Sequence, residues 1–149
     1  MEKYAYSIKT TRVREPDFPY NGEKIDCTDK TVSFLRHLQS ADNEKLIAIY
    51  LNPQNKIIGI SISEGIVNQA PAYPREIVRK GLLLNATAII LAHNHPSGEP
   101  MPSAADIDMT KKVRDAAKLL DMVLHDHIVI AGDTGKFLSI REEGMMNFA

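Results

Sequence analysis

The spacing of hydrophobic positions along the chain predicts an alternation of short strands and amphipathic helices. Apolar residues separated by one polar residue indicate strands, and apolar residues three or four apart indicate helices. In the first half of the chain the pattern predicts a short strand around Tyr4 to Ile8, a Pro-rich linker over residues 16–22, a helix from Thr28 or Asp29 as its cap to about Gln39, and a hairpin of strands over residues 46–51 and 56–63.

The second half of the chain predicts two more helices and three more strands. They are a helix over residues 75–84 that starts at Pro74, a strand over residues 86–92, a helix over residues 104–120 capped by Ser103, and strands over residues 124–130 and 137–140. The strand over residues 86–92 is apolar throughout, which is typical of a central strand buried on both faces. We therefore expect an α/β sandwich with a mixed sheet and helices on its faces.

Composition adds that the chain is a globular protein of one domain. Its 149 residues, 44% hydrophobic and 25% charged, have the balance of a compact soluble domain. A formal net charge of −1 argues against a globally basic nucleic-acid binder. The single cysteine, Cys27, excludes a disulfide within the monomer and fits a reducing compartment. Without a membrane-spanning run or a secretory signal, we expect a cytoplasmic protein that does not contact membranes.

Two histidines lie where the apolar strand over residues 86–92 ends. His93 and His95 are separated by one residue, so in extended backbone both side chains point to the same side. Asp106 follows in the first turn of the next helix, after a loop that three prolines stiffen. Two imidazoles and one carboxylate, with no cysteine nearby, suit a catalytic zinc site with an open fourth position. A purely structural explanation also exists, because Ser103 and Asp106 suit the start of any helix.

The string H-x-H-x7-S-x2-D, formed by His93, His95, Ser103 and Asp106, resembles the full JAMM signature of the JAB/MPN metallopeptidase family. Its surroundings, ILAHNHPSGEPMPSAADIDMT after YPREIVRKGLLLNA, resemble the RadC branch of that family. The resemblance implies a cytidine-deaminase-like α/β fold. It also implies that His93, His95 and Asp106 bind Zn²⁺ and that Ser103 helps to stabilise a tetrahedral intermediate.

The same resemblance implies an activity and a domain organisation. The activity is hydrolysis of an amide bond in a peptide or isopeptide substrate by a metal-activated water. We expect an N-terminal arm over residues 1–27, a JAB/MPN domain over residues 28–142 and a C-terminal tail over residues 143–149. RadC proteins commonly carry a helix-hairpin-helix domain before the JAB domain. About 27 residues are too few for one, so we expect nucleic-acid binding to be weak or indirect.

A zinc hydrolase also needs a general base that takes a proton from the attacking water. In JAMM enzymes a glutamate from the strand after the first helix has this role, and four glutamates compete for it here: Glu44, Glu64, Glu76 and Glu99. The context of Glu44, DNEKLIAIYL, resembles the family's position, so we assign the base to Glu44. An ordinary exposed carboxylate at a strand edge is the structural alternative for Glu44.

His125, Asp126 and His127 repeat the H-x-H spacing at the start of a predicted strand. No carboxylate follows them at a matching distance, so we expect a structural or supporting role. In a regular strand, His125 and His127 would share one face and Asp126 would lie on the other.

Two other functions stay open at this point. One is a DNA-repair or mobile-element accessory protein with a structural or vestigial metal site. The other is a non-catalytic scaffold that binds a protein partner through the same groove. The net charge argues against the first, and the complete set of ligands and serine argues against the second.

Overall fold

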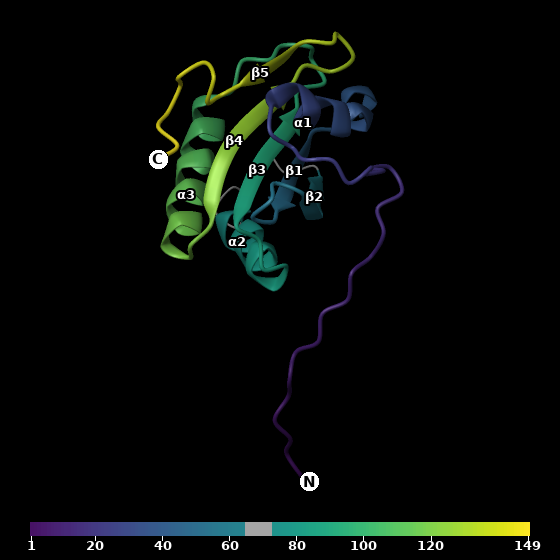
Figure 1. Cartoon of the computed structure of the whole chain (residues 1–149), viewed down its shortest axis with the longest axis vertical. Helices are drawn as coiled ribbons and strands as arrows, with labels where there is room; N and C mark the ends of the chain where they lie inside the picture. Colours follow the sequence, from purple (N-terminus) through teal and green to yellow (C-terminus); the bar gives the residue numbers. More distant parts are fainter. Residues whose placement is uncertain (65–72) are drawn as a thin grey trace.

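A five-stranded mixed sheet organises the chain in the computed structural model, which describes residues 1–64 and 73–149 (Figure 1). The elements in chain order are α1 (Thr28–Phe34), a 3₁₀ helix (Arg36–Ser40), β1 (Lys45–Leu51), β2 (Ile57–Glu64), α2 (Tyr73–Leu83), β3 (Ala88–Asn94), α3 (Ala104–Leu119), β4 (Val123–Ile130) and β5 (Phe137–Ser139). Within the described ranges, every helix is too short or too polar to cross a membrane.

The strand order across the sheet is β2-β1-β3-β4-β5. β1 pairs antiparallel with β2, which confirms the predicted hairpin, and β1 also pairs antiparallel with β3. β3 and β4 are parallel, and α3 makes the crossover between them. Every residue of β3 is buried, as a central strand requires. The predicted α/β architecture with a mixed sheet is therefore confirmed.

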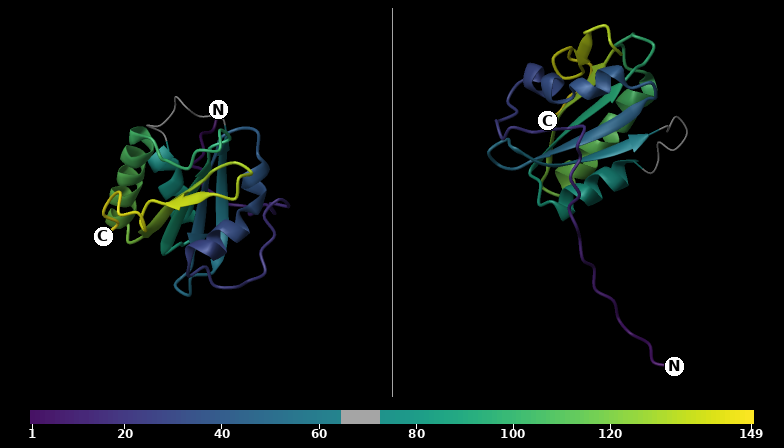
Figure 2. Two further views of the ribbon diagram at one scale, coloured as in Figure 1. Left: turned by 90° about the horizontal axis from the view of Figure 1, so that it is seen from above. Right: turned by 90° about the vertical axis from the view of Figure 1, so that its right-hand side faces the viewer.

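Two hydrophobic cores lie on opposite faces of this sheet. α2 and α3 cover one face, and α1 with the 3₁₀ helix covers the other (Figure 2). β1 serves both cores by alternation, because Ile47 and Ile49 pack on the α1 side while Ala48 and Tyr50 pack on the other. Burial of each large apolar side chain contributes about 1.5–3 kcal/mol, so the two cores hold the central strands firmly in register.

The predicted N-terminal strand is wrong. Residues 1–14 form neither helix nor strand, and the side chains of Tyr4, Tyr6 and Ile8 are 68–91% exposed. In Figure 1 this arm runs away from the sheet. A strand needs a neighbour for its backbone hydrogen bonds, and alternation of apolar residues alone does not supply one.

The predicted helix over residues 28–39 forms in two pieces. α1 ends at Phe34, and a 3₁₀ helix continues the chain to Ser40. The tighter 3₁₀ turn aligns residues three apart, which lets Leu35 and Leu38 both enter the core. The predicted cap is also wrong. Cys27 occupies the N-cap position without a side-chain hydrogen bond, and the Thr28 hydroxyl instead donates to Glu142 at 2.7 Å.

A bulge in β4 changes which face its side chains reach. Ile89 pairs with Leu124 but Ile90 pairs with Asp126, so His125 is an extra residue in the ladder. Beyond the bulge, His127 reaches Thr110 of α3, whereas His125 and Asp126 line a pocket on the α1 side. The expectation that His125 and His127 share a face is therefore wrong, because the extra residue shifts the alternation by one.

Leu91→Ala should lower the free energy of unfolding by about 2–5 kcal/mol, because it deletes a fully buried side chain from the central strand. Equilibrium denaturation in urea measures this difference. Leu119→Ala is the matched control, since Leu119 is 83% exposed at the end of α3 and should change stability by less than about 0.5 kcal/mol. Equal losses in the two variants would contradict the placement of the core.

Candidate metal centre

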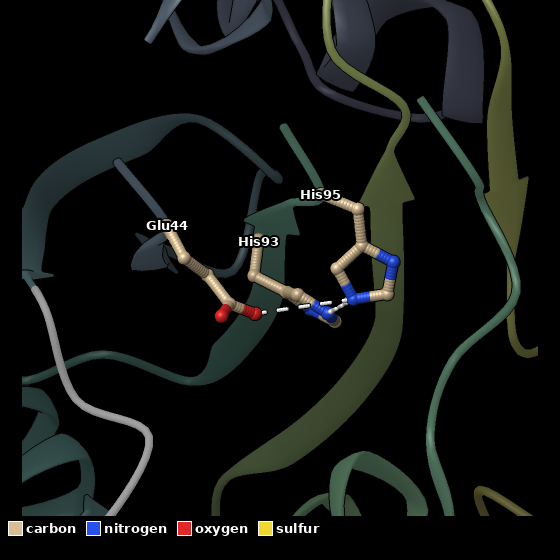
Figure 3. A group of neighbouring side chains, drawn as sticks. All are labelled: Glu44, His93 and His95. Carbon is tan, nitrogen blue, oxygen red and sulfur yellow. Dashed lines mark hydrogen bonds and ion pairs between the residues drawn. The ribbon is translucent and has the colours of Figure 1, made fainter. Parts of the chain in front are cut away.

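The carboxyl end of β3 gathers polar side chains from three segments of the chain. His93 is the penultimate residue of β3, and His95 extends the strand by donating its backbone N–H to the Ile130 carbonyl at 2.8 Å. Asp106 lies in the first turn of α3, the helix that leaves this end of the strand. The antiparallel register that pairs Leu46 with His93 also brings Glu44 alongside His95 (Figure 3).

Three donor atoms converge at this point. His93 Nε2 lies 2.8 Å from His95 Nε2, and Asp106 Oδ2 lies 3.3 Å and 3.6 Å from these two nitrogens. Glu44 Oε1 is farther away, at 3.9 Å from His95 Nε2, although Glu44 and both histidines each place an atom within 4.8 Å of the others. Exposure separates them in the same way: the side chains of His93, His95 and Asp106 are 4–21% exposed, against 42% for Glu44.

The three convergent atoms fit a small tetrahedral cation. Ligand atoms about 2.0–2.1 Å from a tetrahedral zinc ion lie about 3.3 Å from one another, and the three separations here spread around that value. His95 Nδ1 lies 2.8 Å from the Glu99 carbonyl oxygen, which can only accept. His95 therefore donates from Nδ1, and its Nε2 offers a lone pair to the centre. Both the spacing and the donor set match zinc.

The three groups shift one another's pKa. Partial burial would raise the pKa of Asp106, but the rings of His93 and His95 beside it and the hydrogen bond from the Ser103 backbone hold the pKa of its carboxyl well below the usual range. Asp106 in turn raises the pKa of His95, because its carboxylate favours the protonated ring. Asp106 is therefore a carboxylate at neutral pH, which is the form that binds a metal ion.

Ser103 and Asp106 form a capping box at the start of α3. The Ser103 hydroxyl oxygen accepts from the Asp106 backbone N–H at 3.0 Å, and Asp106 Oδ2 accepts from the Ser103 backbone N–H at 2.8 Å. The same Oδ2 faces the two histidines, so the cap fixes the position of this carboxylate. The cap uses Ser103 only as an acceptor and leaves its O–H hydrogen for another partner.

Asn94, between the two histidines, fastens the segment that carries Glu44. Its side chain is fully buried; its Oδ1 accepts from the Lys45 backbone N–H at 2.7 Å, and its Nδ2 donates to the carbonyls of Asn43 and Ala41 at 3.0 Å and 3.4 Å. Residue spacing alone does not indicate this role of Asn94. An asparagine in an otherwise apolar central strand is the signal that could have revealed it, since buried amides need partners.

The other candidate glutamates lie in different settings. Glu76 forms an ion pair with Arg79 at 2.7 Å on the exposed side of α2, and the exposed Glu99 contributes its backbone carbonyl to His95. Glu64 ends β2 and pairs with Lys45 in the register. Among the described residues, Glu44 is the glutamate that groups with both His93 and His95.

Comparison with known proteins shows which family this chain resembles. A family model described as the RadC-like JAB domain matches residues 25–145, a range that includes every residue of the centre. A UPF0758 protein of Rhodobacter capsulatus is 47% identical over 104 residues, which cover 69% of this chain and 48% of that protein. The chain thus spans about half the length of this relative.

Asp106→Asn should weaken zinc binding by at least about tenfold, because it removes the charged member of the three convergent donors. Competition with a chromophoric chelator measures the affinity. His125→Ala is the control and should bind zinc as the natural chain does, since His125 lies on the opposite face of the sheet. Unchanged affinity in a His93→Ala/His95→Ala double variant would contradict the location of the centre.

Asn94→Ala should loosen the segment that carries Glu44, because it removes three hydrogen bonds to the backbone of residues 41–45. Each buried group that loses its partner costs about 1–3 kcal/mol, so amide exchange in this segment should accelerate. Hydrogen–deuterium exchange read by mass spectrometry measures it. Asn52→Ala is the control: Asn52 accepts from the backbone of Gln54 and Lys56 in the β1–β2 turn, so exchange should rise there instead. Identical exchange maps for the two variants would show that Asn94 does not fasten this segment.

Proposed function

The chain belongs to the RadC-like JAB domain family, and from that membership we propose that it is a zinc-dependent hydrolase of amide bonds in a peptide or isopeptide substrate. The observation that carries the proposal is the convergence of His93 Nε2, His95 Nε2 and Asp106 Oδ2, with a fourth, more exposed carboxylate beside them. Three inner donors and one outer carboxylate are the parts that metal-assisted hydrolysis needs.

His93, His95 and Asp106 would hold the zinc ion. When bound, zinc supplies a Lewis acid that polarises the scissile carbonyl and lowers the pKa of a water towards about 7. The three residues are suited to this because they supply three of the four donors of a tetrahedral zinc ion, and Asp106 balances part of the charge of a divalent cation.

Glu44 would act as the general base. Its Oε1 lies 3.9 Å from His95 Nε2, farther than any separation among the three inner donors, so Glu44 lies next to the centre, where it would face a water bound there. Its side chain is 42% exposed, so it faces the side from which a substrate enters. Glu44 would accept a proton from the attacking water as the new C–O bond forms. It would then give that proton to the amine that leaves when the C–N bond breaks.

Ser103 would stabilise the oxyanion that develops on the scissile carbonyl. Its hydroxyl hydrogen is not used by the helix cap, and the cap orients the side chain beside Asp106. One donor of this kind is typically worth about 3 kcal/mol of barrier. The capping box would thus place a ligand and an oxyanion donor together.

Glu44→Gln should reduce turnover about 10²–10⁴-fold without loss of zinc, because the amide keeps the shape of the side chain but cannot accept a proton. A peptide-library cleavage screen identifies a substrate, and initial rates on that substrate with metal analysis of the same samples measure both quantities. Glu99→Gln is the control and should stay near natural activity, since only the backbone of Glu99 contacts the centre.

Full activity of Glu44→Gln would show that another group is the base. A natural chain that binds zinc stoichiometrically yet cleaves nothing in the library would instead favour the non-catalytic scaffold.

A further inference from the structure

A continuous row of short hydrogen bonds runs through the interior from α3 to His93. Thr110 Oγ1 lies 2.6 Å from the Asp106 carbonyl oxygen and 2.6 Å from His127 Nδ1. His127 Nε2 lies 2.6 Å from His93 Nδ1. Thr110 and His127 are fully buried and His93 is nearly so, so no water shares these contacts. Each contact must therefore contain one hydrogen atom.

Only one arrangement of hydrogens satisfies the whole row. The Asp106 carbonyl can only accept, so the Thr110 hydroxyl donates its single hydrogen to it. The Thr110 oxygen then accepts from His127 Nδ1. His127 is fully buried, and its two ring nitrogens contact the Thr110 hydroxyl and the His93 ring, neither of which carries a negative charge, so this ring is neutral and its Nε2 accepts. His93 therefore donates from Nδ1, which leaves a lone pair on its Nε2.

We propose that Thr110 and His127 are positioning residues that fix the tautomer of His93, so that His93 Nε2 is always available as a metal ligand. The proposal takes the metal centre from the proposed function and does not depend on hydrolysis. His95 reaches the same state by a shorter route, because the Glu99 carbonyl accepts from its Nδ1.

The arrangement of the two rings favours a cation between His93 Nε2 and His95 Nε2. With both Nδ1 atoms committed as donors, two neutral rings present lone pairs to each other across 2.8 Å. Lone pairs at this distance repel unless a proton or a metal ion lies between them. A swapped tautomer at His93 would place a hydrogen in the position of the ion, so the row of hydrogen bonds favours metal binding over that state.

The first test reads the tautomers directly by ¹⁵N–¹H NMR of the full chain with labelled histidine, with and without zinc. At about pH 8, above the usual pKa of histidine, protonated and unprotonated ring nitrogens have well-separated ¹⁵N shifts. We expect Nδ1 to carry the hydrogen in both His93 and His127 before zinc is added. A hydrogen on His93 Nε2 in the zinc-free natural chain would overturn the proposal.

The second test changes the far end of the row. Thr110→Val removes the hydroxyl at similar volume, which lets His127 carry its hydrogen on Nε2 and lets His93 take the other tautomer. We expect zinc affinity to fall about 10–100-fold, the usual cost of losing a residue that supports a ligand. Thr110→Ser keeps the hydroxyl and should restore most of the affinity.

Thr31→Val is the matched control. Thr31 is also a buried helical threonine whose hydroxyl donates to the carbonyl four residues earlier, but it lies in α1 on the other face of the sheet. Its loss should leave zinc affinity unchanged.

Two outcomes would overturn the proposal. One is a folded Thr110→Val chain with natural affinity, and the other is an equal loss of affinity in Thr31→Val. If Thr110→Val does not fold, the spectra of the natural chain decide. If the natural chain binds no zinc, the proposed function fails, and the tautomer of His93 is still read from the zinc-free spectra.

Discussion

The backbone ladders on the two edges of β3 decide where His93, His95 and Glu44 of the candidate metal centre lie. On one edge, the antiparallel register with β1 sets Leu46 against His93 and so brings Glu44 beside His95. On the other edge, the parallel pairing with β4 sets His127 where it can reach His93. The two histidines thus depend on the most deeply buried strand of the molecule. Positions held by two cores and two ladders vary little, which suits chemistry that fails when atoms move by an ångström.

Asp106 both caps α3 and faces the two histidines of the candidate metal centre. One carboxylate oxygen accepts from the Ser103 backbone and also faces the rings of both histidines. The backbone carbonyl of the same residue accepts the hydroxyl hydrogen that starts the row of hydrogen bonds through Thr110. A structural explanation of the S-x2-D spacing and a functional one are therefore not alternatives. The cap holds this carboxylate in place beside the two histidines, and the first turns of α3 also contact, through Thr110, the His127 ring that reaches His93.

Much of the architecture follows from periodicity alone, and the exceptions have a common cause. The hairpin, the apolar central strand and the helix after Ser103 all form, because their patterns are long and locally unambiguous. The strand around Tyr4 to Ile8 does not form, since pairing requires a neighbour that no local pattern reveals. The roles of Asn94 and Thr110 are equally hidden, because each depends on which distant backbone group or ring the fold sets against it. Residue types and their spacing indicate which side chains could bind a metal ion. The contacts that support those side chains depend on the tertiary fold and cannot be predicted from local sequence.

The bulge at His125 shifts the alternation of side chains along the rest of β4 by one residue. The H-x-H spacing occurs at the end of β3 (His93 and His95) and again in β4 (His125 and His127). If both strands were regular, the two histidines of each pair would lie on one face of the sheet. The one extra residue divides the second pair, so that His127 supports the centre while His125 faces the other core. Insertion of a single residue between Asp126 and His127 would turn His127 to the α1 face and remove its contact with His93 without changing any residue of the candidate centre. The centre is therefore more sensitive to the length of β4 than to the identity of most side chains along it.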